Sequence, residues 1–330
     1  MGMVHDIIEA GGKEAALRAD IERAVVEAAS LYMADESVGM GFLYSGWCQA
    51  ALPHRRLPDE APWQIVSDHI TLAVEPGRRP DAGGKLVSVG VPYGSRARLI
   101  MLYLQSEALR TGSRDVLLGR SLRDWLGRMG ISTGGKSQKD VREQAERIAR
   151  CRFTFHVNTG NRVGLVNQNV VDSAMFVPSE NPAHSALFVE VARLSEVFFD
   201  QLRKHPVPVE EGAIRAISNN SVALDLYAWL AYRLHALPKS TPVSWAALKG
   251  QFGAGCARMD NFKPTFLANL KLALAVYRHA KVDIDERGLI LHPSRPPVAP
   301  RAMSPGKVPT PAKVPAPGKV PTRSMQRTLI

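Results

Sequence analysis

The stretch that decides the fold reads GVPYGSRARLIMLYLQSEAL at residues 90–109, VLLGRSLRDWLGRMGISTGG at 116–135 and KSQKDVREQAERIARCRFTFHV at 136–157. Apolar residues recur at helical spacing in all three segments, and residues 151–157 and 165–171 are typical of paired strands. We therefore predict three short amphipathic helices and a β-hairpin, with lysine and arginine concentrated on the third helix. That order is typical of a winged helix, whose third helix enters the major groove of DNA.

The same order recurs later in the chain. Its three helices and its hairpin read SVALDLYAWLAYRLHAL, TPVSWAALKGQFG, FKPTFLANLKLALAVY, and KVDID with LILH. Ser121, with Asp124 three residues on, and Ser244 are expected to cap the second helix of each copy. Ser121 follows Tyr103 by 18 residues, and Ser244 follows Tyr227 by 17. Matching order and spacing predict an α+β protein with tandem winged-helix domains, while chance similarity of two helix pairs is the alternative.

The remaining segments have weaker patterns. Apolar residues at helical spacing predict a first helix over residues 13–33. Alternation predicts strands over residues 63–74 and 85–92 around a turn-rich EPGRRPDAGG. Residues 186–205 are expected to form an extended stretch and a helix that bridges the two copies.

Charge is distributed unevenly over the predicted parts. The 330 residues carry a net charge of +11, and counts by segment give −5 for residues 1–93, +7 for 94–152, +2 for 153–292 and +7 for 293–330. The positive charge is concentrated in particular segments. This distribution is more typical of a module that enters a DNA groove than of a uniformly basic protein. We predict an N-terminal helical or irregular segment at 1–62, winged-helix domains at 63–180 and 181–292, and a disordered basic, proline-rich tail at 293–330.

Over roughly residues 63–292, the sequence resembles the RepA-like replication initiators encoded by bacterial plasmids. The motifs that carry the resemblance are VPYGSRARL at 91–99, GRSLRDWLGRMG at 119–130, and STGG followed by REQ at 142–144. The resemblance implies binding to repeated sites in duplex DNA at a plasmid origin and recruitment of host replication proteins. Many such initiators also form homodimers and repress their own promoter. Spacing and charge alone support only DNA binding, so a winged-helix transcriptional repressor is the alternative.

The third helix of the first copy carries the main candidates for DNA contact. Val141, Ala145 and Ile148 recur on one side and are expected to face the core. The polar residues left on the other side and at the amino end are Lys136, Gln138, Lys139, Arg142 and Arg150. Arginine and glutamine can read guanine and adenine edges, which favours Arg142 and Gln138 for base contacts and the lysines for phosphate. The alternative is a solvated face on which Glu143 pairs with Arg147.

Further candidates lie outside this helix. They are Arg96 and Arg98 after the Pro-Tyr-Gly turn, Arg162 between the hairpin strands, and Lys263, Lys271 and Arg278 in the second copy. Arg96 and Arg98 begin a helix, whose free amides favour phosphate; the alternative is that they pair with acidic residues of the N-terminal segment. Core packing is the stronger interpretation for most of the second copy's third helix, where Pro264 is expected in the first turn.

Residues 130–137 satisfy the phosphate-loop pattern GxxxxGK[ST]. Such a loop needs a buried strand before its glycines, but SLRDWLGRM has its apolar residues at helical spacing. A turn between two helices is therefore preferred, and a P-loop ATPase remains the rival from another class. No catalytic constellation, metal site or cofactor is predicted, and we do not expect an enzyme.

Cysteine usage and hydropathy predict a cytoplasmic location. Cys48, Cys151 and Cys256 lie far apart without a CxxC pair, which favours neither a disulfide framework nor a zinc site. The amino terminus is acidic and amphipathic, unlike a signal peptide, and no apolar run approaches membrane-spanning length. We therefore expect no membrane as a partner. The expected partner is duplex DNA, as the basic third helix indicates.

Overall fold

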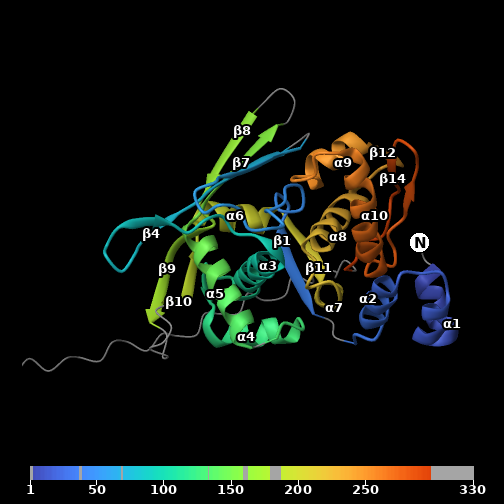
Figure 1. Cartoon of the computed structure of the whole chain (residues 1–330), viewed down its shortest axis with the longest axis horizontal. Helices are drawn as coiled ribbons and strands as arrows, with labels where there is room; N and C mark the ends of the chain where they lie inside the picture. The colour runs from blue at the N-terminus through green and yellow to red at the C-terminus, as the bar shows by residue number, and fades with distance from the viewer. Residues whose placement is uncertain are drawn as a thin grey trace, which may run out of the picture. The chain divides into compact units, whose positions relative to one another are not determined.

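In the computed structural model, all residues described below belong to one compact unit, residues 1–299 (Figure 1). The structure describes residues 3–36, 39–67, 70–132, 134–158, 163–178 and 187–298. Arg162 and the predicted tail from residue 299 onward lie outside these residues. So does the predicted domain boundary at 180–181, and the division into domains stays a prediction.

The first half follows an order of one helix, one short strand, two helices and then strands. Its elements are α3 (Gly94–Thr111), β6 (Asp115–Leu117), α4 (Gly119–Arg128), α5 (Gly135–Arg150), β7 (Arg152–Asn158), β8 (Val163–Gln168), β9 (Val171–Pro178) and β10 (Leu187–Leu194). The three predicted helices are confirmed as α3, α4 and α5. β9 and β10 form a hairpin, and β10 also pairs with β6, so the strand order is β6-β10-β9.

The second half repeats this arrangement. Its elements are α8 (Ser221–Arg233), a 3₁₀ turn η1 (Leu234–Ala236), β12 (Thr241–Ser244), α9 (Trp245–Phe252), α10 (Met259–Ala275), β13 (Val282–Ile284) and β14 (Gly288–Leu291). The strand order β12-β14-β13 matches β6-β10-β9. The cap on α9 is confirmed, because the Ser244 hydroxyl accepts from the Ala247 amide at 3.2 Å. The cap predicted at Ser121 is wrong, because α4 begins at Gly119 and Ser121 lies inside the helix.

The position of Pro264 differs from the prediction, because α10 begins at Met259 and holds this proline in its interior. Phe262 explains the earlier start. Its ring is 2% exposed and lies 5.3 Å from that of Phe266, so burial of both rings draws the preceding residues into the helix.

The hairpin predicted directly after α5 is present as β7 and β8, but it belongs to another sheet. With β2 (Trp63–Val66) and β3 (Ile70–Glu75) it forms the strand order β2-β3-β7-β8. Phe153, Phe155, Leu72 and Val74 are completely buried on one face, and this face packs against Trp47. The apolar alternation of β7 is thus satisfied by β3, and the later hairpin β9–β10 pairs with β6.

The segment predicted to bridge the two copies, residues 186–205, lies elsewhere in the structure. It forms β10, which joins the first half, and α6 (Glu196–Lys204), which follows it. The chain between the halves continues as β11 (Pro206–Glu210) and α7 (Glu211–Ala216). β11 pairs along its whole length with β1 (Met40–Tyr44), and β1 packs on α3. Tyr44 fixes this strand by donating its amide to the Gln105 side chain at 2.7 Å.

The N-terminal segment forms two helices, α1 (Met3–Arg18) and α2 (Arg23–Met33), where one was predicted. α1 ends at Arg18, and Glu22 (φ −54°, ψ 127°) lies outside the helical region directly before α2. The break lets α2 pack on α1 and on α10, and Ala16 and Val26 are buried in these helices. His5 fastens α1 to the end of α10 through a hydrogen bond of 2.8 Å with the Ala275 carbonyl.

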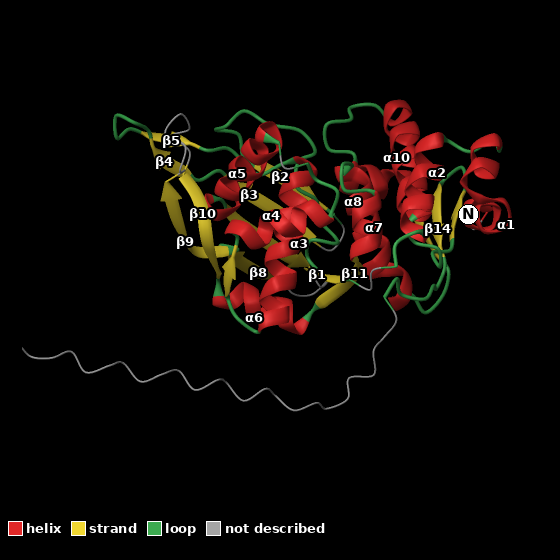
Figure 2. Ribbon diagram, turned by 90° about the horizontal axis from the view of Figure 1, so that it is seen from below, coloured by secondary structure: helices red, strands yellow, loops and turns green. Residues whose placement is uncertain are grey.

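Strand β4 (Arg78–Pro80) was missed. It lies within the stretch predicted as a turn and pairs with β5 (Leu86–Ser88), which falls in the predicted strand 85–92. The hairpin lies at one edge of the molecule in both views (Figures 1 and 2). β4 was missed because Pro76, Gly77 and Pro80, which are typical of turns, lie in it or directly before it.

Candidate nucleic-acid interface

Helix α5 presents the clearest division between a buried and an outward face. It packs against α3 on one side and against the β9–β10 hairpin on the other. Ala145 and Ile148 are buried as predicted, and Val141 is partly buried against the same core. Lys136 and Lys139 are exposed, while Arg142 is half-buried.

The amino end of α5 is open. Gly134 and Gly135 have nothing within 4 Å of the position that a Cβ would occupy, and the helix begins without a side-chain cap. Amides in a first helical turn have no partner within the helix and carry a partial positive charge. Together with Lys136 and Lys139, this end favours an anion such as a phosphate group. Gln138 lies in the same turn and is half-buried.

The loop before α3 holds α5 in place. Gln144 accepts the Tyr93 amide at 2.8 Å, and Arg147 donates to the Val91 carbonyl at 2.9 Å. The Arg147 guanidinium also lies 5.2 Å from the centre of the Tyr93 ring. Gly90 has φ +74°, and a Cβ there would lie 2.2 Å from an Arg147 nitrogen, so only glycine fits. Two motifs quoted above, VPYG and REQ, therefore meet in space.

The pairing expected between Glu143 and Arg147 is confirmed at 2.8 Å, but it is not a solvated surface pair. Arg147 is 2% exposed and also bonds Asp59 at 3.1 Å. Sequence reasoning missed its role in positioning α5. The available signal was its place on the apolar stripe, three residues after Gln144 and next to Ile148.

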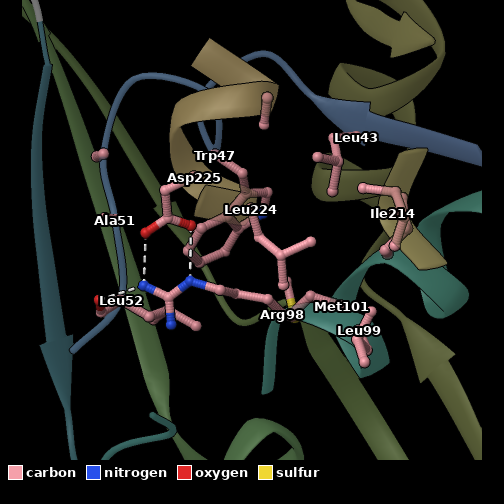
Figure 3. Close-up of a pocket in the computed structure, with 13 residues that line it drawn as sticks. Leu43, Trp47, Ala51, Leu52, Arg98, Leu99, Met101, Ile214, Leu224 and Asp225 are labelled. Atoms are coloured by element: carbon pink, nitrogen blue, oxygen red, sulfur yellow. Dashed lines mark hydrogen bonds and ion pairs between the residues drawn. The ribbon is translucent and has the colours of Figure 1, made fainter. Parts of the chain in front are cut away.

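Arg98 is buried inside the protein, whereas the sequence predicted a contact with DNA (Figure 3). Its guanidinium binds both oxygens of Asp225 at 2.6 Å each, and the side chains are 9% and 12% exposed. The other donors reach the carbonyls of Leu52 at 2.6 Å, Gly94 at 2.9 Å and Pro53 at 3.2 Å. All five N–H groups are then engaged, which leaves none for a phosphate. We therefore do not keep Arg98 among the DNA contacts.

The Arg98–Asp225 pair joins α3 of the first half to α8 of the second. It lines a cavity of 40 Å³ together with apolar side chains that include Trp47 and Leu224 (Figure 3). His54 lies against the pair, with Nδ1 3.0 Å from the Ser221 hydroxyl. Burial and the positive charge of Arg98 lower the pKa of His54 to about 4. We call these three residues, Arg98, Asp225 and His54, the joint.

Two other first-half candidates have partners inside the protein. Arg96 is half-buried and donates to the Asn219 side chain at 3.2 Å, so it too reaches the second half. Arg150 binds Glu146 at 3.1 Å and the Arg78 carbonyl at 3.3 Å. For Arg96 the alternative was a pair with the N-terminal segment, whereas its hydrogen bond is to Asn219 of the second half. Both stay predicted DNA contacts.

The second-half candidates contact other parts of the chain. Lys271 binds Glu22 at 2.6 Å, and Arg278 forms a two-pronged pair with Glu9, in which the Nη2–Oε2 distance is 2.9 Å. Lys263 lies with its ammonium 5.1 Å from the centre of the Trp245 ring. The structure therefore keeps these three apart from α5 and brings two of them to the acidic N-terminal helices.

The segment with the phosphate-loop pattern is entered by a helix. α4 ends at Arg128, Gly130 has φ +75°, and α5 begins at Gly135. The element directly before these glycines is a helix and not a strand, in agreement with the preferred interpretation as a turn between helices.

Cys151 is buried between α5 and β7, and burial raises the pKa of its thiol to about 11.

Within the described ranges, no group of three or more histidine, cysteine, aspartate or glutamate side chains is arranged to hold a metal ion. None of the helices described has the length and apolar character needed to cross a bilayer.

The fold and these residues define a mixed helix-and-strand protein with two similar halves and one outward basic helix. Residues 91–246, which run from the loop before α3 into α9, match the family of plasmid encoded RepA proteins. This match confirms the resemblance to RepA-like plasmid initiators. The family stretch contains the VPYG loop, all of α5 and the joint partners Arg98 and Asp225.

Comparison with other proteins adds little beyond the family. No curated protein matches the chain. Among solved structures, domains 2 and 3 of RctB align with a TM-score of 0.49 and 12% identity, covering 76% of this chain and 98% of that one. A second structure of RctB domains 2–3 aligns with a TM-score of 0.43 and 11% identity, covering 74% and 93%. Both TM-scores are below 0.5, so the likeness does not establish a shared fold.

Proposed function

We propose that this protein initiates plasmid replication by binding repeated sites in duplex DNA at the origin, with α5 as its main recognition helix. The observation that carries the proposal is the outward face of α5. Lys136 and Lys139 project there beside an open helix terminus, while the opposite face is buried. Outside α5, Arg98, Lys271 and Arg278 are engaged with the protein's own carboxylates.

Both halves are proposed to be winged helices. Each has the order helix, strand, helix, helix and hairpin, and in each the last strand lies between the other two. In this fold the third helix enters the major groove and the hairpin contacts the adjacent backbone. This assigns the wing of the first half to β9–β10, in place of the β7–β8 hairpin that follows α5 directly.

The residues of α5 divide by the contact that each can make. Lys136 and Lys139 are assigned to phosphates, because an exposed ammonium is a point charge that does not depend on base identity. Arg142 and Gln138 are assigned to base edges, since their planar groups can bond guanine or adenine in two places. Both lie within the first half of the helix, where recognition helices contact bases.

The wider biology follows from the family likeness. Recruitment of host replication proteins, formation of a homodimer and repression of its own promoter belong to the proposal on that ground alone, as does a cytoplasmic location. The second candidate function is a winged-helix repressor, which the same α5 face favours equally. Direct repeats beside an A·T-rich stretch in the neighbouring DNA distinguish the initiator from a repressor, whose operator is a single palindrome.

The test is a titration of the full-length protein with labelled duplex DNA at several salt concentrations. We expect log affinity to fall steeply and linearly against log salt, because phosphate contacts release counterions. The variant Lys136→Ala/Lys139→Ala should lose affinity and have a shallower slope. The matched control is Lys13→Ala/Lys239→Ala, which removes the same charge from exposed positions elsewhere.

Three outcomes overturn this proposal. One is a flat salt dependence, and another is equal behaviour of the two double variants. The third is stoichiometric, magnesium-dependent ATP binding that Lys136→Ala abolishes, because that would make residues 130–137 a nucleotide site. We propose that the protein is no enzyme and expect no ATPase activity in either form.

A further inference from the structure

The β4–β5 hairpin is an exposed basic element that the function proposed above does not use. Every residue from 78 to 86 is exposed. Three of these residues are basic, Arg78, Arg79 and Lys85, and only Asp81 is acidic. Leu86 is 60% exposed, so the hairpin has no apolar core of its own to bury.

The tip of the hairpin has a fixed shape. One Asp81 carboxylate oxygen accepts the amides of Gly83 and Lys85, each at 2.9 Å, and the Asp81 carbonyl accepts the Gly84 amide at 3.0 Å. Gly84 has φ +81°, a conformation that glycine adopts without strain. The one acidic side chain therefore organises the turn, and the basic side chains are presented from an ordered backbone.

The base of the hairpin is attached to the last turn of α5. Arg150 donates to the Arg78 carbonyl at 3.3 Å, and Arg79 lies 3.7 Å from the Glu146 carboxylate. A Cβ on Gly77 would lie 2.1 Å from the Arg150 carbonyl oxygen, so the two backbones approach as closely as only glycine allows. Any movement of α5 on DNA would carry the hairpin with it.

The length of α5 determines which part of the DNA lies near the hairpin. Its 16 residues span about 24 Å at 1.5 Å per residue, whereas the major groove is about 12 Å wide. A helix of this length that enters the groove by its amino end and runs across it therefore extends past the edge of the groove. Its carboxyl end then faces the sugar-phosphate backbone, and so does any element attached there.

We infer that the β4–β5 hairpin is a second contact to the DNA backbone, with Arg78 and Lys85 on phosphates beyond the carboxyl end of α5. This inference rests on the proposed function of α5. Arg79 is assigned to holding the hairpin, because it pairs with Glu146. The contact is independent of sequence, since phosphates are the same at every base pair.

The experiment compares Arg78→Ala/Lys85→Ala with the wild type and with the Lys13→Ala/Lys239→Ala control, on origin DNA and on random duplex. We expect a loss of roughly tenfold at low salt, similar on both DNAs, and a salt slope smaller by about 2. Arg78→Lys/Lys85→Arg keeps the charge and should bind as the wild type does. Far-ultraviolet circular dichroism and thermal melting check that all variants fold.

The outcomes separate the two proposals. If the wild type binds duplex DNA and Arg78→Ala/Lys85→Ala binds with the same affinity and slope, the hairpin contact is overturned and the α5 proposal stands. A loss confined to origin DNA with an unchanged slope also overturns it, because that indicates base contact or a protein partner. If the wild type does not bind duplex DNA, both proposals are overturned.

Discussion

Helices α5 and α10 occupy the same place in two halves of similar order, yet their basic residues are used differently. On α5, Lys136 and Lys139 point outward from an open end. On α10, Lys271 is paired with a carboxylate of the N-terminal segment, and so is Arg278, which follows the helix. A shared scaffold therefore does not imply a shared surface.

The difference arises from neighbours that are distant in the sequence. The N-terminal helices pack against α10, and α5 is flanked by the basic β4–β5 hairpin. The electrostatic potential therefore differs in sign at the two similar helices, negative beside α10 and positive beside α5. The following predictions test whether DNA binding follows this asymmetry.

The largest effect is expected at the joint that connects the two halves. Arg98→Met leaves the Asp225 carboxylate buried without its partner, which should lower the free energy of unfolding by about 3–5 kcal/mol. Arg98→Met/Asp225→Leu should recover much of the loss, because it removes the unpaired charge as well. Thermal and denaturant unfolding measure both. If Arg98→Met melts normally and binds DNA poorly, Arg98 is a DNA contact after all.

The second prediction concerns specificity within α5. Arg142→Ala should weaken binding to the specific site by about 1–3 kcal/mol and affect random DNA much less. Lys139→Ala should weaken both, because its contact is to phosphate. Competitive titrations with the two DNAs give the comparison. Equal losses for both variants on both DNAs would mean that α5 contacts only the backbone, and would direct attention to Lys263 in the second half.

The third prediction is a pH dependence of stability that arises at the joint. The folded state holds the pKa of His54 at about 4, against 6.5 for the free side chain, so the unfolded chain binds the proton first as the pH falls. The free energy of unfolding should therefore decrease below about pH 6.5, by about 2 kcal/mol between pH 7 and pH 5. Burial also lowers the pKa of His5. His54→Gln should remove most of the dependence, and an unchanged slope would contradict this assignment.

The smallest effect is expected beside α10. Lys271→Ala breaks an exposed pair with Glu22, which should cost less than about 1 kcal/mol of stability. DNA affinity should stay at the wild-type value, in contrast to Lys139→Ala. Arg278→Ala should likewise leave DNA affinity unchanged. A clear loss of DNA binding in either variant would show that the N-terminal helices release α10 when DNA arrives, and the asymmetry would then apply only to the free protein.

Local patterns in the sequence were sufficient to place most helices. The third predicted helix is present as α5, which ends at Arg150 directly before the predicted strand at 151–157. Its apolar spacing depends only on residues of the helix itself. The Ser244 cap was predicted for the same reason, since its partner is three residues away. The two similar halves were also visible as a repeated order of elements.

The errors concern contacts between distant residues. The alternating apolar residues of β7 predict a strand with one buried face. They do not predict whether that strand pairs with β3 or with β6, because either neighbour leaves the same face buried. Charge alone could not separate Arg98 from Lys139, although one is buried and the other exposed. The carboxylates that hold Lys271 and Arg278 are 249 and 269 residues away in the sequence.

The pairing of β1 with β11 sets a geometric requirement on the DNA. The chain between the halves is not a free linker, since the Glu210 amide also bonds the Tyr227 hydroxyl of α8 at 3.1 Å. Torsional stiffness of this kind fixes the angle between α5 and α10, the helices that the winged-helix proposal assigns to the DNA grooves. If both halves contact one duplex, their half-sites must keep a constant helical phase. Inserting about five base pairs between the half-sites turns one to the far side of the duplex, whereas about ten restore the phase.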